Sequence, residues 1–81
     1  MSMTMTCREA VLESMRALVR RSGRQVFKVE EIVQEVLAHH AFKENTVRTH
    51  ITSRMCADAP DHHGTVYADL DRVGHGLYRL R

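Results

Sequence analysis

Short polar side chains and two arginines are concentrated between residues 44 and 56. Asn, Thr and Ser side chains hydrogen-bond to bases and phosphates, and threonine methyl groups can touch the methyl group of thymine. At about 100° per residue, a helix over this segment places Thr49 and Ser53 at the centre of its outward face. Beside that centre lie Asn45, Thr46, Thr52 and Cys56, flanked by Arg48 and Arg54. The pattern favours contact with a nucleic acid, in which the arginines bind phosphate or guanine. The alternative is an ordinary solvated helix face.

A second group surrounds Gly74-His75-Gly76, a spacing typical of a tight hairpin turn. Such a turn can approach a sugar-phosphate backbone closely, and nearby positive charge comes from Arg72, Arg79 and Arg81. The alternative is a hairpin whose arginines are only solvated. A third basic group either binds phosphate at the edge of a groove or is surface charge alone. Its members are Arg16, Arg20, Arg21, Arg24 and Lys28.

The sequence gives little support to metal binding or catalysis. Its six histidines include the adjacent pairs His39-His40 and His62-His63, and neighbours on a helix diverge by about 100° instead of converging on a metal. There is no glycine-rich phosphate loop, nucleophile elbow or HExxH motif. Cys7 and Cys56 are expected to be reduced thiols, with a single disulfide between them as the alternative. We therefore expect no metal, no cofactor and no enzymatic activity.

Length and composition are those of one small globular domain. A chain of 81 residues supports one hydrophobic core, and 43% hydrophobic with 27% charged residues argues against disorder. The net charge of +2 is mildly basic, and basic and acidic blocks alternate along the chain. No apolar run approaches the ~20 residues that cross a bilayer, and the first residues lack the features of a signal peptide. We expect a cytoplasmic protein without membrane contact, with residues 1–5 disordered and residues 6–81 forming the domain.

The first of the elements that must position these residues is a helix with clear ends. Thr6-Cys7-Arg8-Glu9 is a capping box, and Gly23 can take the left-handed conformation that ends a helix. Between them, helical spacing relates Val11, Leu12, Met15, Leu18 and Val19.

The remaining elements follow in the order short strand, helix, helix and hairpin. An extended segment is expected at 25–28 and a second helix from about Val29 to His39, with a core stripe of Ile32, Val33, Val36 and Leu37. The third helix is expected from Glu44 to Cys56, docked on the first two through Val47, Ile51 and Met55. A polar loop at 57–68 leads to strands at 70–73 and 77–80.

Two segments carry a resemblance to a known family. Glu44-Asn45-Thr46-Val47-Arg48-Thr49-His50-Ile51 resembles the third helix of small prokaryotic winged helix-turn-helix domains. Arg72-Val73-Gly74-His75-Gly76-Leu77-Tyr78-Arg79-Leu80 resembles their closing hairpin, in which an aromatic and a leucine pack under the wing. Such domains are similar to winged helices attached to chromatin and restriction-type proteins. The resemblance covers roughly residues 7–81 and implies an α+β fold, with three helices plus a small antiparallel β-hairpin wing.

The residues and the resemblance together predict binding of double-stranded DNA. The third helix is expected to enter the major groove while the wing contacts the adjacent backbone, in a transcriptional regulator or accessory DNA-binding protein. A homodimer or a protein partner would enlarge the small footprint. The alternative is a protein-interaction module, which the acidic second helix and the Asp-containing loop favour. The candidate DNA contacts are Asn45, Thr46, Arg48, Thr49, Thr52, Ser53, Arg54, Arg72, His75 and Arg79.

Overall fold

The computed structural model describes residues 5–54 and 69–81, and its first helix, α1 (Cys7–Ser22), has the predicted ends. The Thr6 hydroxyl accepts from the Glu9 amide at 3.1 Å, and Glu9 Oε1 accepts from the Thr6 amide at 3.0 Å. The backbone hydrogen bond from Thr6 holds the pKa of the Glu9 carboxyl below its usual value. At the other end Gly23 has a φ of 75°. The predicted capping box and glycine stop are both confirmed.

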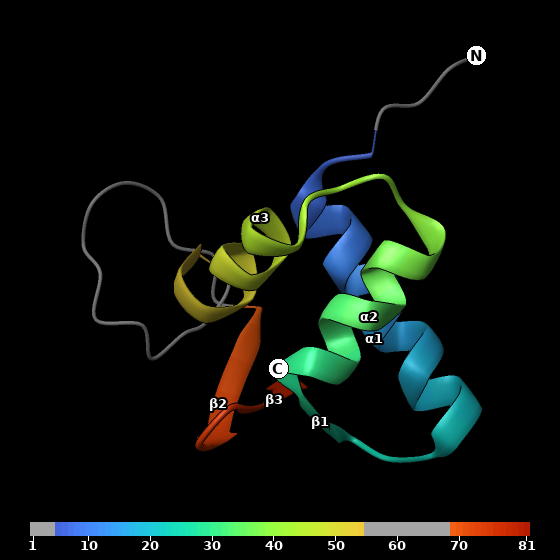
Figure 1. Ribbon diagram of the computed structural model, residues 1–81. Helices are drawn as coiled ribbons and strands as arrows, with labels where there is room; N and C mark the ends of the chain where they lie inside the picture. Colours follow the sequence, from blue (N-terminus) through green and yellow to red (C-terminus); the bar gives the residue numbers. More distant parts are fainter. Residues whose placement is uncertain (1–4, 55–68) are drawn as a thin grey trace.

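The chain then forms strand β1 (Val26–Lys28), helix α2 (Val29–His39) and helix α3 (Glu44–Thr49). The start of α2 is fixed by Glu31, whose Oε1 accepts from the Lys28 amide at 2.9 Å. Helices α1 and α2 lie side by side (Figure 1). Both helices have the predicted boundaries, and in each a glutamate side chain accepts from the amide of the N-cap residue.

The prediction of one α-helix from Glu44 to Cys56 is wrong beyond Thr49. A π-helical segment, η1 (His50–Arg54), follows α3 directly. The His50 ring Nδ1 hydrogen-bonds the Thr46 carbonyl at 2.9 Å, and the Thr52 hydroxyl donates to the Arg48 carbonyl at 2.9 Å. Side chains that bond carbonyls four residues back compete with the α-helical ladder and distort it. Residues 55 and 56, and the loop predicted at 57–68, lie outside the described residues.

Strands β2 (Leu70–Gly74) and β3 (Leu77–Leu80) form the predicted hairpin, with β1 as a third strand on the other side of β3. All pairs are antiparallel, and the ladder between β2 and β3 is irregular between Arg72 and Gly74. Of the two turn glycines only Gly76 has a positive φ, 68°. Gly74 instead leaves room for Leu77, because a Cβ there would lie 3.1 Å from Leu77 Cδ1. The segment predicted only as extended thus completes the sheet.

The core lies where the helices meet one face of this sheet. Phe27 stands opposite Tyr78, and Leu70 stands opposite Leu80, so these side chains share the inner face. The largest fully buried side chains are Phe27, Met15, Ile32, Ile51, Leu70, Val11, Val33, Val36 and Val47. The predicted stripes of α1 and α2 are therefore confirmed, with Leu12, Val19 and Leu37 half-buried at their margins, and Val47 and Ile51 of the third stripe are buried. The fold class is confirmed as α+β, three helices with a small antiparallel sheet in the order of a winged helix.

The two ends of the predicted domain have further contacts. Arg8 and Asp69 form a bidentate ion pair, with N···O distances of 2.7 and 2.8 Å, that joins the start of α1 to the residue before β2. Met5 is half-buried and packs against the core, while residues 1–4 of the segment expected to be disordered lie outside the described residues. None of the described helices is long and apolar enough to cross a membrane.

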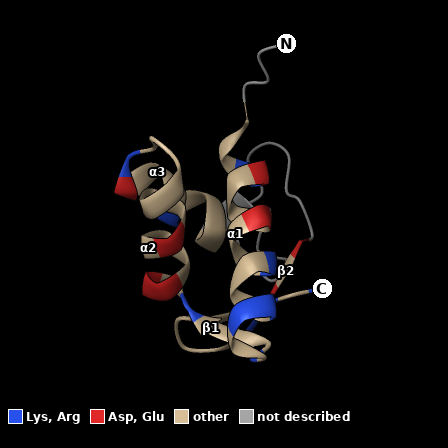
Figure 2. Cartoon of the chain, turned by 90° about the vertical axis from the view of Figure 1, so that its right-hand side faces the viewer, with Lys and Arg blue, Asp and Glu red and all other residues tan. Residues whose placement is uncertain are grey.

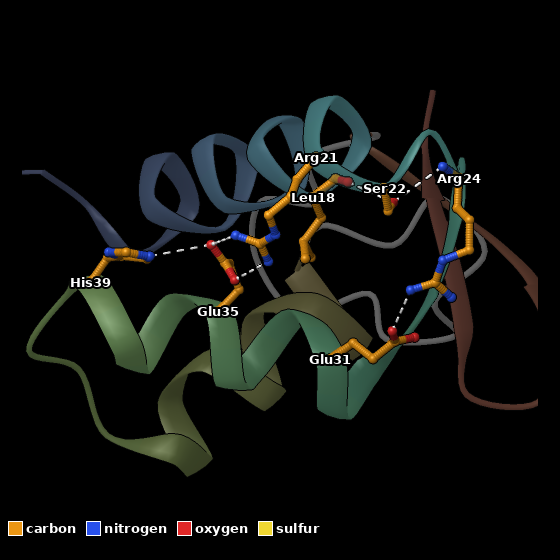
Figure 3. A network of polar contacts seen from close by, with 7 residues as sticks. All are labelled: Leu18, Arg21, Ser22, Arg24, Glu31, Glu35 and His39. Carbon is orange, nitrogen blue, oxygen red and sulfur yellow. Dashed lines mark hydrogen bonds and ion pairs between the residues drawn. The ribbon is translucent and has the colours of Figure 1, made fainter.

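Ion pairs also connect α1 with α2 (Figure 3). Arg21 donates to both oxygens of Glu35, at 2.8 and 3.3 Å, and His39 Nε2 lies 3.3 Å from Glu35 Oε2. Arg24 donates to Glu31 at 2.7 Å. The hydrogen bonds from Arg21 and Arg24 lower the pKa of the Glu35 and Glu31 carboxyl groups, respectively. Two cations of the third basic group are therefore engaged within the domain.

These lowered pKa values predict acid sensitivity. A carboxyl whose pKa is lower in the folded than in the unfolded chain stabilises the fold fully above its ordinary pKa, and that contribution is lost as protons bind to the folded form. Stability should therefore fall as the pH drops below the ordinary value of 4.5 for Glu35. We expect the fall in urea midpoint to be smaller in Glu35→Gln. Glu13→Gln, at an exposed carboxylate 3.9 Å from His40, is the control and should behave as the wild type. Identical acid profiles for Glu35→Gln and the wild type would contradict this.

Candidate nucleic-acid interface

A groove of about 500 Å³ separates η1 and the start of α2 from the wing. Its walls include Thr52 of η1, Glu30 of α2, and Arg72 and His75 of the wing. Three of the candidate contacts, from segments some twenty residues apart in sequence, thus meet at one groove. The fold achieves this because the sheet places the β2–β3 turn beside the N-terminus of α2, where the Val29 amide donates to the Gly76 carbonyl at 3.0 Å.

A second, more open hollow of about 290 Å³ lies on α3. It is lined by Asn45, Thr46, Thr49 and His50, and the first three are exposed, on the face where the sequence places them. His50 was not among the candidates. Because the Thr46 carbonyl can only accept, His50 Nδ1 must carry the proton of their hydrogen bond, which leaves Nε2 available to a ligand when the ring is neutral. The spacing of four residues from Thr46 is the signal that sequence reasoning could have used.

Thr52 is half-buried, and its hydroxyl proton is engaged by the Arg48 carbonyl. A hydroxyl in this state can accept a hydrogen bond from a ligand but has no second proton to donate. Thr52 is therefore unsuited to donating a hydrogen bond to a phosphate oxygen. It remains suited to contact with a donor such as a base amino group.

Arg48 lies between two carboxylates. Its Nη2 is 3.2 Å from Glu44 on the same helix, and its Nη1 is 3.4 Å from Glu30 on α2. The hydrogen bond to Glu44, together with the weaker one to Glu30, raises the pKa of the Arg48 guanidinium above its usual value. The positive charge is thus offset locally, and two acidic side chains share this part of the surface. Glu30 and Glu44 are residues whose role here the sequence reasoning missed.

Arg72 and His75 are exposed on the wing, and neither has a carboxylate partner among the residues described. Arg72 stands opposite Tyr78 in the β2–β3 ladder, so it lies on the inner face of the sheet, beside the groove. An exposed guanidinium without an internal partner is available to bind an anion. Of the candidate arginines whose side chains are described, Arg72 is therefore the best placed for contact with phosphate.

Arg79 lies on the other side of the sheet. It is next to the inward-facing Tyr78 and stands opposite Asp71, with its Nε 3.9 Å from the Asp71 carboxylate. Arg81 also pairs with Asp71, at 3.2 Å. The structure therefore does not bring Arg79 to the groove, and strand alternation from Tyr78 would have shown this. Ser53 and Arg54 belong to η1, but their side chains are not among those described.

The rest of the described surface is mixed in charge (Figure 2). The C-terminal half of α1 is basic, its N-terminal half carries charges of both signs, and the visible charges of α2 are acidic. Arg16 and Arg20 are exposed on α1, without an ion pair to any other residue described. The exposed side of α1 has fewer polar, uncharged side chains than the exposed face of α3.

The described residues can be searched for a metal site and for a reactive thiol. No group of three or more His, Cys, Asp or Glu side chains within 5–54 and 69–81 is placed to hold a metal ion. Cys7 is buried, and burial raises the pKa of its thiol, which disfavours the reactive thiolate.

The profile of one protein family matches residues 6–80, nearly the whole chain. The chain belongs to this family, a domain of unknown function (DUF7669). The match extends over the DUF7669 domain from the N-cap of α1 to the end of β3, and so includes both sides of the groove. No curated protein and no solved structure is significantly similar to the chain.

Proposed function

We propose that this DUF7669 domain binds double-stranded DNA as a winged helix of the prokaryotic type. The observation that supports the proposal is the groove in which Thr52 of η1 faces Arg72 and His75 of the wing, next to the polar face of α3. A cytoplasmic transcriptional regulator or accessory DNA-binding protein fits this role, without enzymatic activity or a cofactor.

The arrangement suits a duplex because α3 presents polar side chains for base edges and the wing presents positive charge for the phosphate backbone. In helix-turn-helix proteins the second helix of the motif enters the major groove, and here that helix is α3. Its exposed Asn45, Thr46 and Thr49 are short enough to permit close approach to base edges. The wing, with Arg72 and a turn at Gly76, is placed to contact a neighbouring phosphate backbone.

The number of cations available to phosphate determines the DNA affinity that we expect of one domain. Of the lysines and arginines lining the groove, Lys28 and Arg72 have no ion pair to another described residue. Two phosphate contacts correspond to a slope of log K against log salt of roughly −2. Binding by one domain should therefore be modest, and a homodimer or a protein partner would strengthen it.

The test is fluorescence anisotropy of a labelled random-sequence duplex with the purified protein. We expect binding at about 50 mM salt that weakens about tenfold or more at about 200 mM. Absence of binding at the lower salt concentration would contradict the proposal.

A protein-interaction module is the second candidate function. It is favoured by the Glu30–Arg48–Glu44 cluster, because acidic side chains beside α3 repel phosphate and suit a basic or mixed protein surface. If the duplex does not bind, affinity capture with the wild type and with Arg48→Glu tests this alternative. A specific partner would be retained by the wild type and lost by the variant, whereas equal retention would argue against this surface.

A further inference from the structure

Arg48 lines neither hollow of the interface, but it lies close to residues of both and pairs with Glu30, which lines the groove. It is one helical turn before Thr52, which lines the groove, and it is adjacent in sequence to Thr49, which lines the hollow on α3. Its side chain is 37% exposed, so part of it is open to a ligand. A duplex bound to both hollows would therefore come near this side chain.

The two carboxylates fix the direction of the guanidinium. Glu44 holds Nη2 from within α3, and Glu30 holds Nη1 from the neighbouring helix α2. Because a guanidinium has further N–H donors in a rigid planar fork, these two bonds do not exhaust its capacity. Anchoring from two helices reduces the rotamer freedom that a free arginine would lose on binding.

The same carboxylates determine which ligand the guanidinium can accept. A phosphate approaching Arg48 would also approach Glu30 and Glu44, within 3.4 Å of the guanidinium nitrogens. Their negative charges offset the attraction that a free arginine would exert. A base edge carries no net charge, so the carboxylates repel it less than they repel a phosphate. The O6 and N7 atoms of guanine are the acceptor pair that matches the arginine fork.

We propose that Arg48 reads a guanine in the major groove and makes no phosphate contact, with Glu30 and Glu44 as its positioning residues. This inference rests on the proposed function of DNA binding. It divides the interface into a base-reading side at α3 and a phosphate-binding side at Arg72.

The experiment combines selection from a randomised duplex library with salt titration, for the wild type, Arg48→Ala and Arg48→Lys. We expect the wild type to select one G·C pair that both variants stop selecting, with a loss of discrimination of about tenfold. Arg48→Lys keeps the charge but not the fork, so it should retain affinity for a random duplex. Neither variant should change the salt slope. Circular dichroism melting checks that each variant is folded.

Glu44→Gln tests the positioning role, because the amide keeps an acceptor for Arg48 and removes the charge. This variant should bind random duplex more tightly and with a steeper salt slope, since Arg48 becomes available to phosphate. The inference is overturned if the G·C preference survives in Arg48→Lys, if the wild type selects no base, or if Arg48→Ala reduces the salt slope by about one. Absence of any wild-type binding would overturn the proposed function as well, which distinguishes the two failures.

Discussion

Phe27→Ala is expected to lower the free energy of unfolding by about 3–5 kcal/mol, the cost of truncating a fully buried aromatic side chain. Phe27 has no exposed surface and is among the largest fully buried side chains described. It stands opposite Tyr78 in the sheet, and the Arg24 guanidinium lies 5.0 Å from its ring centroid. The residue thus joins β1 to β3 and to the helices, so its loss leaves a cavity at the centre of the fold.

The measurement is urea denaturation followed by circular dichroism. Native domains have a total stability of about 5–15 kcal/mol, so the variant should lose a large part of it. Phe42→Ala is the matched control, because Phe42 is only half-buried against the core. Phe42→Ala should lower the free energy of unfolding by about half as much or less, because Phe42 buries a smaller area. Equal losses for the two variants would contradict the assignment of the core.

Arg72→Ala is expected to weaken binding of a random DNA duplex roughly tenfold or more at about 50 mM salt, and to make the salt slope shallower by about 0.9. The reason is that Arg72 is exposed beside the groove without a carboxylate partner among the described residues. Charge-assisted hydrogen bonds to phosphate are among the stronger polar contacts. The change is on an exposed position of an edge strand, so the melting temperature should change little.

Arg79→Ala is the matched control for this prediction. It removes the same charge from the same hairpin, but Arg79 lies on the opposite face of the sheet, across from Asp71. We expect its affinity to differ from that of the wild type only by the small effect of net charge. If the two variants weaken binding equally, the effect is one of overall charge and the proposed contact at Arg72 is wrong. If only Arg79→Ala weakens it, the duplex binds the outer face of the sheet.

Local signals explain why much of the fold was predictable. The capping box at Thr6 and Glu9 and the glycine stop at Gly23 act within one or two turns, so the residues that determine each boundary are adjacent in sequence. The turn at Gly76 is equally local. The buried stripes follow from helical spacing, because any amphipathic helix must cover its apolar face.

The features that the sequence did not predict depend on residues far apart in the chain, or on competing hydrogen bonds of similar free energy. The Arg8–Asp69 pair joins residues 61 positions apart, and the Arg48–Glu30 pair joins residues 18 apart, so neither is visible before the chain is folded. The change from α3 to η1 reflects competition between backbone and side-chain hydrogen bonds at His50 and Thr52, which differ little in free energy. In the candidate site, the exposure of the α3 face and the i,i+4 pair of Glu44 with Arg48 were foreseeable, but the contact of Arg48 with Glu30 was not.

The most direct measurement of the central claim is an NMR titration of ¹⁵N-labelled protein with a random-sequence DNA duplex at about 50 mM salt. The account predicts that the amide signals of Thr46, Thr49, Thr52 and Gly76 shift, because these residues line the two hollows or the turn of the wing. Those of Arg16 and Arg20, on the exposed side of α1, should remain in place. Shifts confined to α1, or no shifts at all, would contradict the assignment of the α3–wing surface as a DNA-binding site.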